Sequence, residues 1–459
     1  MYSYTRLLPQ AAAAMLILSG CATKYDARPI GPLSGPLYGA AQAPTLEGQE
    51  AEPRASAEAL FERADLEVYL KFGLEHSAQL RTAFEGWRAT TERVEQMSTL
   101  PAPRLSFGAF IEEVQTRTGP QQRRFGLSQA FPWPGKLGAK ADLASRQAEA
   151  AWEQVEQERL RVARRIEEAF HGYAFLGQEL AITTELLGLV KGLEPVVQGR
   201  IRAGAGQEDL LRLQVEIGRL EDDVASISQR RPALSARLAD AMNMPLGGAA
   251  AVLPLPELSA PARTSRDTAA LVEQALYSSP RLRVLEKGLE AARAAEEVTK
   301  YQRRPDLVAR VDYIDTGEAL NSGAPGSGDD PLFVGLSLSL PVWTSSYSAA
   351  EREARHSVRA ARSRLEDARS TLNVDIQEEV YSVDDSQRRL ELYRESLIPR
   401  ARELLQLTTA SYRVGSASVL DLLDSERALL EFELSYWRAC REYLQGEARL
   451  TELLGGAVQ

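Results

Sequence analysis

The sequence predicts a mainly α-helical protein that also contains membrane β-structure and is built from one repeat that occurs twice. Long tracts rich in Ala, Glu, Leu and Arg separate a few clusters of Pro and Gly, and this composition is typical of long helices. Two segments in which apolar and polar residues alternate, 103–132 and 305–341, predict β-hairpins. Because a helix, a hairpin and long helices follow in the same order twice, we interpret the chain as an internal duplication.

Ordered matches between the two halves support the duplication. Pro103 corresponds to Pro305 at an offset of 202 residues, and Pro132 corresponds to Pro341 at an offset of 209, because the second hairpin has a longer loop. The segment between the repeats is rich in Pro and Gly, which is typical of a linker. The expected boundaries are 59–245 for the first repeat, 246–265 for the linker and 266–459 for the second repeat.

The N-terminus has the pattern of a lipoprotein signal peptide in residues 1–20. Arg6 supplies a positive charge, an apolar stretch follows, and Leu18-Ser19-Gly20 precedes Cys21; the stretch is too short to span a bilayer as a mature helix. The position of the cysteine resembles the bacterial lipobox, in which Cys21 becomes the lipidated first residue. The alternative is an ordinary signal peptide with an incidental cysteine. Residues 21–58, rich in Pro, Gly and Ala, predict an extended tether.

Composition and motifs argue against several function classes. The net charge is −10 with both signs mixed along the chain, which argues against a nucleic-acid-binding surface. Two cysteines and three isolated histidines predict neither a disulfide framework nor a metal site. The sequence lacks the motifs of nucleotide-binding loops, serine hydrolases and zinc proteases, so we expect no enzymatic activity and no cofactor.

Very long helices are expected. Helical spacing of apolar residues runs from residue 60 to about 100, and after the first hairpin from residue 136 to 203. A helix of about 68 residues is on the order of 100 Å long, far beyond a single globular domain. Pro195 and Pro399 interrupt the corresponding long helices of the two repeats, so we expect a local bend or splice at each.

The predicted strands place a limit on the assembly. Strands of about ten residues are long enough to cross a bilayer when tilted, but four strands cannot close a barrel, and open edges are not tolerated in lipid. Two chains would pool eight strands around a filled interior, whereas three chains would pool twelve around an open lumen. The alternative is a four-stranded soluble sheet packed on helices.

A stiff corner follows each hairpin. Pro132, Trp133 and Pro134 end the first hairpin, and Pro341 and Trp343 end the second. Proline continues neither a central sheet ladder nor a helix interior, so the chain must change direction there. Tryptophan is enriched where membrane barrels meet the interface. We therefore interpret the corner as the boundary between membrane strands and the helices that follow them.

Two motifs carry a family resemblance. The phrase Phe131-Pro132-Trp133-Pro134-Gly135-Lys136-Leu137-Gly138 follows the first hairpin, and Tyr412-Arg413-Val414-Gly415 precedes Val419-Leu420-Asp421-Leu422-Leu423-Asp424. Together with the lipobox and the duplicated order, the chain resembles the TolC-type outer-membrane efflux proteins, specifically the lipoprotein factors that partner RND pumps. The first phrase looks most like the heavy-metal cation branch.

The resemblance implies a homotrimer with a twelve-stranded outer-membrane β-barrel continued by a long periplasmic α-helical barrel. Such a protein is a passive exit duct, anchored in the bacterial outer membrane, for heavy-metal cations or drugs and other small molecules. It docks on a periplasmic adaptor (a membrane fusion protein) and an inner-membrane RND-type pump. The remaining alternative is a periplasmic coiled-coil structural or adaptor lipoprotein without a pore.

The resemblance also assigns a periplasmic gate. Asp421 and Asp424 are three residues apart on one helical face, and in the family an acidic pair at this place lines the narrowest part of the entrance. The alternative is an acidic first turn stabilised by the helix dipole. Tyr412 and Asp209 correspond to family positions that help to hold the closed state, although the first repeat has a one-residue deletion before Asp209.

The turns of the helical hairpins are expected to meet the adaptor. Gly204 and Gly415 stand where each long helix turns back, and glycine suits the left-handed conformation at a helix end. In the family these turns form the tip that contacts the adaptor. Arg202 and Arg413 lie beside them and are either adaptor contacts or solvated charges.

Overall fold

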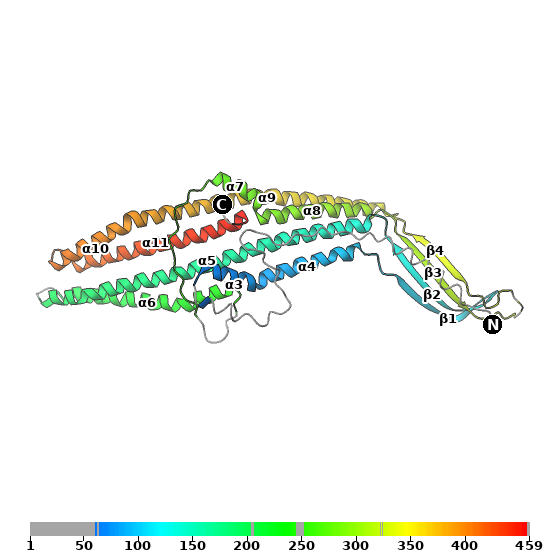
Figure 1. Ribbon diagram of the computed structural model, residues 1–459, viewed down its shortest axis with the longest axis horizontal. Coiled ribbons are helices and arrows are strands. Elements are labelled where there is room, and N and C mark those ends of the chain that lie inside the picture. Colours follow the sequence, from blue (N-terminus) through cyan, green and yellow to red (C-terminus); the bar gives the residue numbers. More distant parts are fainter. Residues whose placement is uncertain are drawn as a thin grey trace. The chain divides into compact units, whose positions relative to one another are not determined.

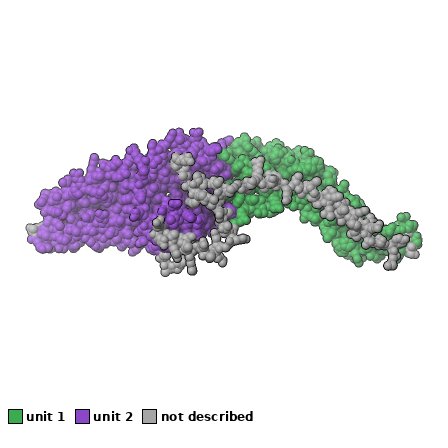
Figure 2. Space-filling model, in the orientation of Figure 1, with its two compact units in different colours: residues 1–31, 85–152, 284–365 green, residues 32–84, 153–283, 366–459 purple. Residues whose placement is uncertain are grey.

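The computed structural model describes residues 60–61, 64–202, 206–244, 252–321, 323 and 325–456. The described chain divides into two compact units (Figure 2): unit 1 contains the described residues within 85–152 and 284–365, and unit 2 contains the others. The expected signal peptide, Cys21 and the tether up to residue 58 lie outside the described residues.

The β-structure of unit 1 is one antiparallel sheet with the strand order β1-β2-β3-β4 (Figure 1). The strands are β1 (Arg104–Thr116), β2 (Gly119–Phe131), β3 (Leu307–Thr316) and β4 (Leu332–Leu338). The turn of the first hairpin is tight, because Gly119 pairs with Thr116 and belongs to β2. In the second hairpin, the expected long loop separates β3 from β4.

The pairing register sorts the side chains of the sheet onto two faces. One face is apolar, and its side chains lie open at the surface of the chain: Leu105 is 80% exposed and Val334 is 69% exposed. The other face carries mainly small, polar and charged residues. Two rows across the four strands illustrate this, Leu105–Leu127–Val311–Val334 on the apolar face and Ser106–Gly126–Asp312–Phe333 on the polar face.

The helix expected from residue 60 to 100 is divided in two. Ser77 separates α3 (Leu66–His76) from α4 (Ala78–Ser98), and Ser279 separates α7 (Thr268–Ser278) from α8 (Pro280–Tyr301). Both serines have an extended backbone. They stand 202 residues apart (279 minus 77), which is the offset that relates the two halves of the sequence. The break is therefore a feature of both repeats that apolar periodicity alone does not detect.

Two long helical hairpins form most of unit 2, although the first parts of α5 and α9 belong to unit 1. The first consists of α5 (Lys136–Arg202) and α6 (Glu208–Ala241), and the second runs through α9 (Thr344–Leu392), α10 (Ile398–Arg413) and α11 (Val419–Leu454). Pro399 behaves as expected, because one π-helical turn, η2 (Tyr393–Leu397), lies directly before it. At Pro195 the structure shows no splice, because α5 continues through it as α-helix, and a bend there stays a prediction. None of the helices in the described chain combines the length and apolarity needed to cross a bilayer.

The core of unit 2 includes part of the expected linker. The fully buried side chains of Tyr69, Ile166 and Tyr173 belong to one apolar cluster with Leu253, which lies in the linker. The Tyr173 hydroxyl donates a 2.6 Å hydrogen bond to the Leu253 carbonyl oxygen. This stretch is therefore packed on the helices, although its composition is typical of a loop.

Candidate functional site

The ends of the two helical hairpins meet in one apolar cluster in unit 2. Val197 of α5 and Leu213 of α6 are fully buried against Tyr412 of α10 and against Val419 and Leu422 of α11. Burial of several such side chains stabilises the contact by about 1.5–3 kcal/mol each. The tips of the two repeats are thus held together by packing, and their polar groups are fixed relative to one another.

Tyr412 is at the centre of this contact. Its side chain is fully buried, and the Arg200 guanidinium carbon lies 4.3 Å from the centre of its ring. Burial raises the pKa of the Tyr412 hydroxyl, the nearby Asp209 carboxylate raises it further, and Arg200 lowers it. Asp209 of the first hairpin thus lies close enough to Tyr412 of the second for its charge to act on the hydroxyl. The role of both residues in a gate stays a prediction.

Asp421 has a structural role at the start of α11. The Ser418 side chain accepts from the Asp421 backbone N–H, and the Asp421 carboxylate accepts from the Ser418 backbone N–H at 2.9 Å. This reciprocal capping box satisfies two helix-end donors. These backbone and side-chain hydrogen bonds from Ser418 lower the pKa of the Asp421 carboxyl. Asp421 therefore stabilises the first turn of α11, which is the structural alternative to a role in the gate.

Asp424 is placed differently. Its side chain is 62% exposed, and its carboxylate lies 3.4 Å from Nη1 of Arg427, one turn further along α11. Ion pairs as exposed as this contribute little to stability. Asp424 thus makes only an exposed ion pair, whereas Asp421 is engaged in the helix cap.

A buried charge network that the sequence analysis did not identify lies next to the tips. Arg427 of α11 binds Glu216 of α6 through two hydrogen bonds, Nε to Oε1 at 3.2 Å and Nη2 to Oε2 at 2.5 Å. The Glu216 side chain is only 5% exposed. Glu426 is also buried, and its pKa is raised to about 7 by burial and then by the charge of Glu216. Two acidic side chains thus share one buried region with one bidentate arginine.

The sequence does carry a signal for this network. On α6, Glu216 lies three residues after Leu213 and four before Leu220, both fully buried or nearly so. A charged residue at a core position of an amphipathic helix is costly to bury unless it has a partner. Such an exception to the apolar pattern indicates a partner on another helix, here Arg427.

The structure describes three of the four predicted adaptor-contact residues. Gly415 has φ +84°, so the turn uses the left-handed conformation that favours glycine, and its backbone N–H donates to the Tyr412 carbonyl oxygen at 3.1 Å. Arg202 and Arg413 are exposed at the ends of their helices. Gly204 lies outside the described residues. The adaptor role of all four stays a prediction.

The corner after the first hairpin is held by one carboxylate. Asp306, just before β3, accepts from the Trp133 backbone N–H at 3.1 Å and from the Lys136 ammonium at 2.8 Å. Gly135 has φ +88° and lies against the ring of Tyr301. The first predicted corner directly precedes α5 and consists of Pro132, Trp133 and Pro134. The second lies at the start of α9 and contains Pro341 and Trp343, whose side chain is 75% exposed.

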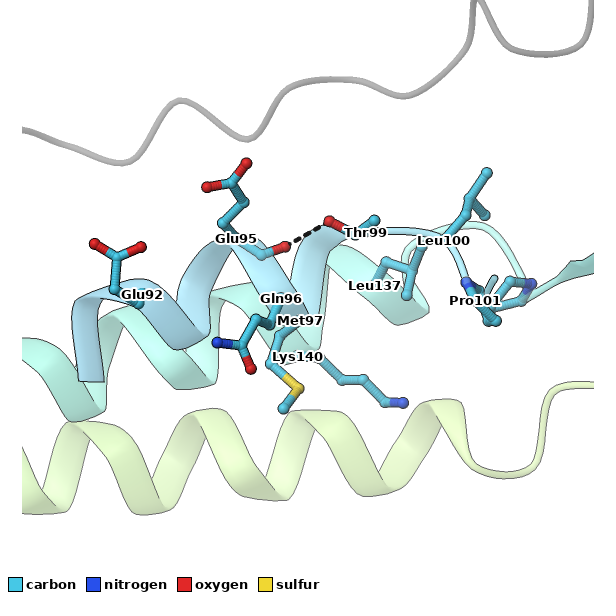
Figure 3. Close-up of a pocket in the computed structure, with 10 residues that line it drawn as sticks. Glu92, Glu95, Gln96, Met97, Thr99, Leu100, Pro101, Leu137 and Lys140 are labelled. Carbon is cyan, nitrogen blue, oxygen red and sulfur yellow. Dashed lines mark hydrogen bonds between the residues drawn. The ribbon is translucent and has the colours of Figure 1, made fainter. Parts of the chain in front are cut away.

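A shallow groove lies beside this corner (Figure 3). It has a volume of about 560 Å³. Its wall includes Met97 and Leu100 at the end of α4, Pro132, and Leu137 and Lys140 at the start of α5. In the described part of the chain, no three His, Cys, Asp or Glu side chains are grouped closely enough to hold a metal ion.

Comparison with known proteins identifies the family. Residues 271–456 match the model of a family described as "Outer membrane efflux protein". These residues, which lie in the second repeat, therefore carry a domain of this family. The relatives of the chain include the cobalt-zinc-cadmium resistance protein CzcC of Cupriavidus metallidurans, which is 21% identical over 401 residues, 85% of this chain and 90% of CzcC. Outer membrane efflux proteins are channels and not enzymes, so the expectation of no catalytic activity is confirmed.

Solved structures agree with the fold. The outer-membrane channel OprN has a TM-score of 0.72 at 19% identity, covering 87% of this chain and 92% of OprN. CusC, a protein that forms a transmembrane channel, has a TM-score of 0.68 at 16% identity, covering 87% of this chain and 94% of CusC. The prediction of a mainly helical chain with a β-hairpin in each half is therefore confirmed. The closed barrel and the trimer stay predictions.

Proposed function

We propose that this outer membrane efflux protein is the exit duct of a tripartite system, and that three copies pool their sheets into a twelve-stranded barrel. The sheet of one chain carries the proposal. Its apolar face is open, and its outer strands β1 and β4 each have one edge without a neighbour in the described chain. Lipid would cover the apolar face, and pairing of β1 with β4 of a second copy would remove the edges.

The helical hairpins would continue the duct into the periplasm. Their tips would meet a periplasmic adaptor through Gly204, Gly415, Arg202 and Arg413, and the adaptor would connect the duct to an inner-membrane RND-type pump. The corner residues around Trp133 and Trp343 would lie at the inner edge of the bilayer. Cys21 would carry lipid that anchors the mature N-terminus. In this proposal the duct itself makes and breaks no bond.

The assembly is tested by two measurements on the purified protein. We expect a trimer that migrates faster on an electrophoresis gel before heating than after it, and discrete conductance steps in planar bilayers. Recovery of a soluble monomer without conductance would contradict the duct and favour a periplasmic adaptor or structural lipoprotein.

The substrate class proposed is heavy-metal cations or drug-like small molecules, and the relationship to CzcC supports the first. Deletion of the gene is expected to lower the tolerated concentration of cobalt, zinc or cadmium, with restoration by a plasmid copy. Increased sensitivity to drugs alone would support the second class instead.

We also propose that Asp421 and Asp424, with Tyr412 and Asp209, form the periplasmic gate. Three copies would bring six carboxylates around one axis, where like charges repel and cations are attracted. Because Asp421 also caps α11, the informative variant is Asp421→Asn with Asp424→Asn, since an asparagine oxygen still accepts at the cap. We expect higher single-channel conductance and a weaker cation preference.

A matched control for the gate is Glu395→Gln in η2, an exposed carboxylate whose ion pair is with its neighbour Arg394. This variant removes one negative charge per chain, half of what the double variant removes, at a distance of several turns from the tip. Equal conductance and cation preference in wild type and in the double variant would remove Asp421 and Asp424 from the gate.

A further inference from the structure

We propose that Arg124 and Arg310, held around Asp312 on the polar face of the sheet, attract anions in the membrane section of the duct. This section would favour anionic solutes, including negatively charged metal complexes, over bare cations. The inference rests on the proposed function, because only a closed barrel turns this face into a lumen. It gives the exit end of the duct a charge preference opposite to that of the acidic tips.

The geometry of the cluster is fixed by one buried carboxylate. The Asp312 side chain is fully buried in the middle of β3. Arg124 of β2 donates from Nε to Oδ1 at 3.2 Å, and Nε of Arg310, two residues before Asp312 on β3, lies 2.6 Å from Oδ2. Each carboxylate oxygen thus has one guanidinium, and the two arginines are held in place from opposite sides.

The neighbouring strand is shaped to admit this carboxylate. Gly126 is the register partner of Asp312 on β2. A Cβ atom on Gly126 would lie 2.5 Å from Asp312 Oδ1 and equally close to Ser106 Oγ, so no larger residue fits without displacing one of them. Ser106 itself donates to the Gly126 carbonyl oxygen at 3.2 Å. The position of Asp312 therefore depends on three strands and is not a chance surface contact.

The charge of the cluster does not cancel. Two guanidinium groups surround one carboxylate, which leaves one positive charge per chain. The side chains of Arg124 and Arg310 are 42% and 46% exposed, whereas Asp312 is not exposed at all. Arg104, at the same face by its pairing with Ser128, adds a further positive charge. A solute on this face therefore meets arginine donors and not the carboxylate that positions them.

Arginine is suited to this function because its planar guanidinium keeps several N–H donors in a fixed fork that fits oxyanions. Asp312 is approached by Nε of each arginine, and both arginine side chains are nearly half exposed, so their guanidinium groups stay accessible to solutes. In pores, rings of Arg or Lys side chains select anions in the same way that rings of Asp or Glu select cations. Three chains would provide such a ring.

The test is the potassium-to-chloride permeability ratio of single channels, measured from the reversal potential in a KCl gradient at low salt. Low salt is required because the Debye length falls to about 3 Å at 1 M. The variants form a charge series at the cluster: Asp312→Asn carries two positive charges per chain, wild type one, and Arg124→Gln none. The triple variant with Arg124→Gln, Arg310→Gln and Asp312→Asn is also neutral and leaves no buried carboxylate unpaired.

We expect the ratio to rise about twofold or more for each positive charge removed, and to fall in Asp312→Asn. The control is Arg123→Gln, which removes the arginine next to Arg124 in the sequence. Arg123 points to the apolar face, where it pairs with Asp315 at 3.8 Å. The permeability ratio of this variant should equal that of wild type. If the channels conduct but the permeability ratio is the same in all variants, the inference is overturned and the proposed duct is upheld. If the wild-type protein shows no conductance at all, the proposed function itself is contradicted.

Discussion

Replacing Arg427 by methionine is expected to loosen the tips of the helical hairpins. The change removes both hydrogen bonds to Glu216 and keeps the aliphatic bulk of the side chain. The Glu216 carboxylate then stays buried, with Arg219 Nη1 at 3.7 Å as a distant partner and the acidic Glu426 nearby. A buried carboxylate that loses its partner destabilises the fold more strongly than the ion pair stabilised it.

The magnitude follows from the exposure of the two partners. A hydrogen bond to a charged group contributes about 1.5–3 kcal/mol, but the Arg427 side chain is 43% exposed, so water weakens the pair. We therefore expect a loss of about 2–3 kcal/mol in the free energy of local opening. This corresponds to a rise of about 30- to 150-fold in the opening constant, since each 1.4 kcal/mol is a factor of ten.

Hydrogen–deuterium exchange on the purified protein measures this opening in peptides of α6 and α11. The matched control is Lys191→Met, which removes an ion pair between α5 and α6 whose partners, Lys191 and Glu221, are both about half exposed. An exposed pair contributes at most about 1 kcal/mol, so exchange should rise only a few-fold. Combining Arg427→Met with Glu216→Gln should recover part of the loss. Equal exchange in Arg427→Met and Lys191→Met would refute the reasoning.

Two further predictions concern pH and the corner. Burial and the charge of Glu216 raise the pKa of Glu426 from 4.5 to about 7, so the folded tip binds a proton more tightly than the unfolded chain. The tip is therefore most stable below pH 4.5. Its stability falls as the pH rises toward about 7 and is constant above that pH. Glu426→Gln should abolish this slope in exchange measured between pH 5 and 8, and a retained slope would assign it to another group. Asp306→Ala removes the acceptor of the Trp133 N–H and of the Lys136 ammonium and should cost about 1–2 kcal/mol. We expect a lower midpoint temperature of thermal unfolding for the purified protein, and an unchanged midpoint would show that Asp306 does not stabilise the corner.

The sequence predicted the elements well because their signals are local. Alternation identifies both hairpins, and helical spacing identifies the helix that begins at Lys136 and ends at Arg202. The errors arose where one residue outweighs a periodic pattern. Ser77 breaks a helix whose apolar spacing continues across it, and Pro195 leaves α5 unbroken, whereas Pro399 follows a π-helical turn.

The site was less predictable because its contacts join residues far apart in the chain. Asp421 and Tyr412 were found through a local motif, but the motif does not indicate that Asp421 caps α11. Glu216 and Arg427 are 211 residues apart, and their pairing follows only from the packing of the two hairpins. A sequence can mark Glu216 as an acidic residue in an apolar stripe, but the partner is specified by the fold.

In the proposed duct, the acidic tips and the basic sheet face together would make the pathway electrically asymmetric. Asp424 would attract cations at the entrance, whereas Arg124 and Arg310 would attract anions in the membrane section. Solutes cross the two regions in series, so the ion selectivity of the wild-type channel reflects both regions together. It does not show what either region contributes. Only the change caused by a variant isolates one region. Neutralising the tip should shift the permeability ratio toward chloride, and neutralising the arginines should shift it toward potassium, so opposite signs distinguish the two sites in one assay.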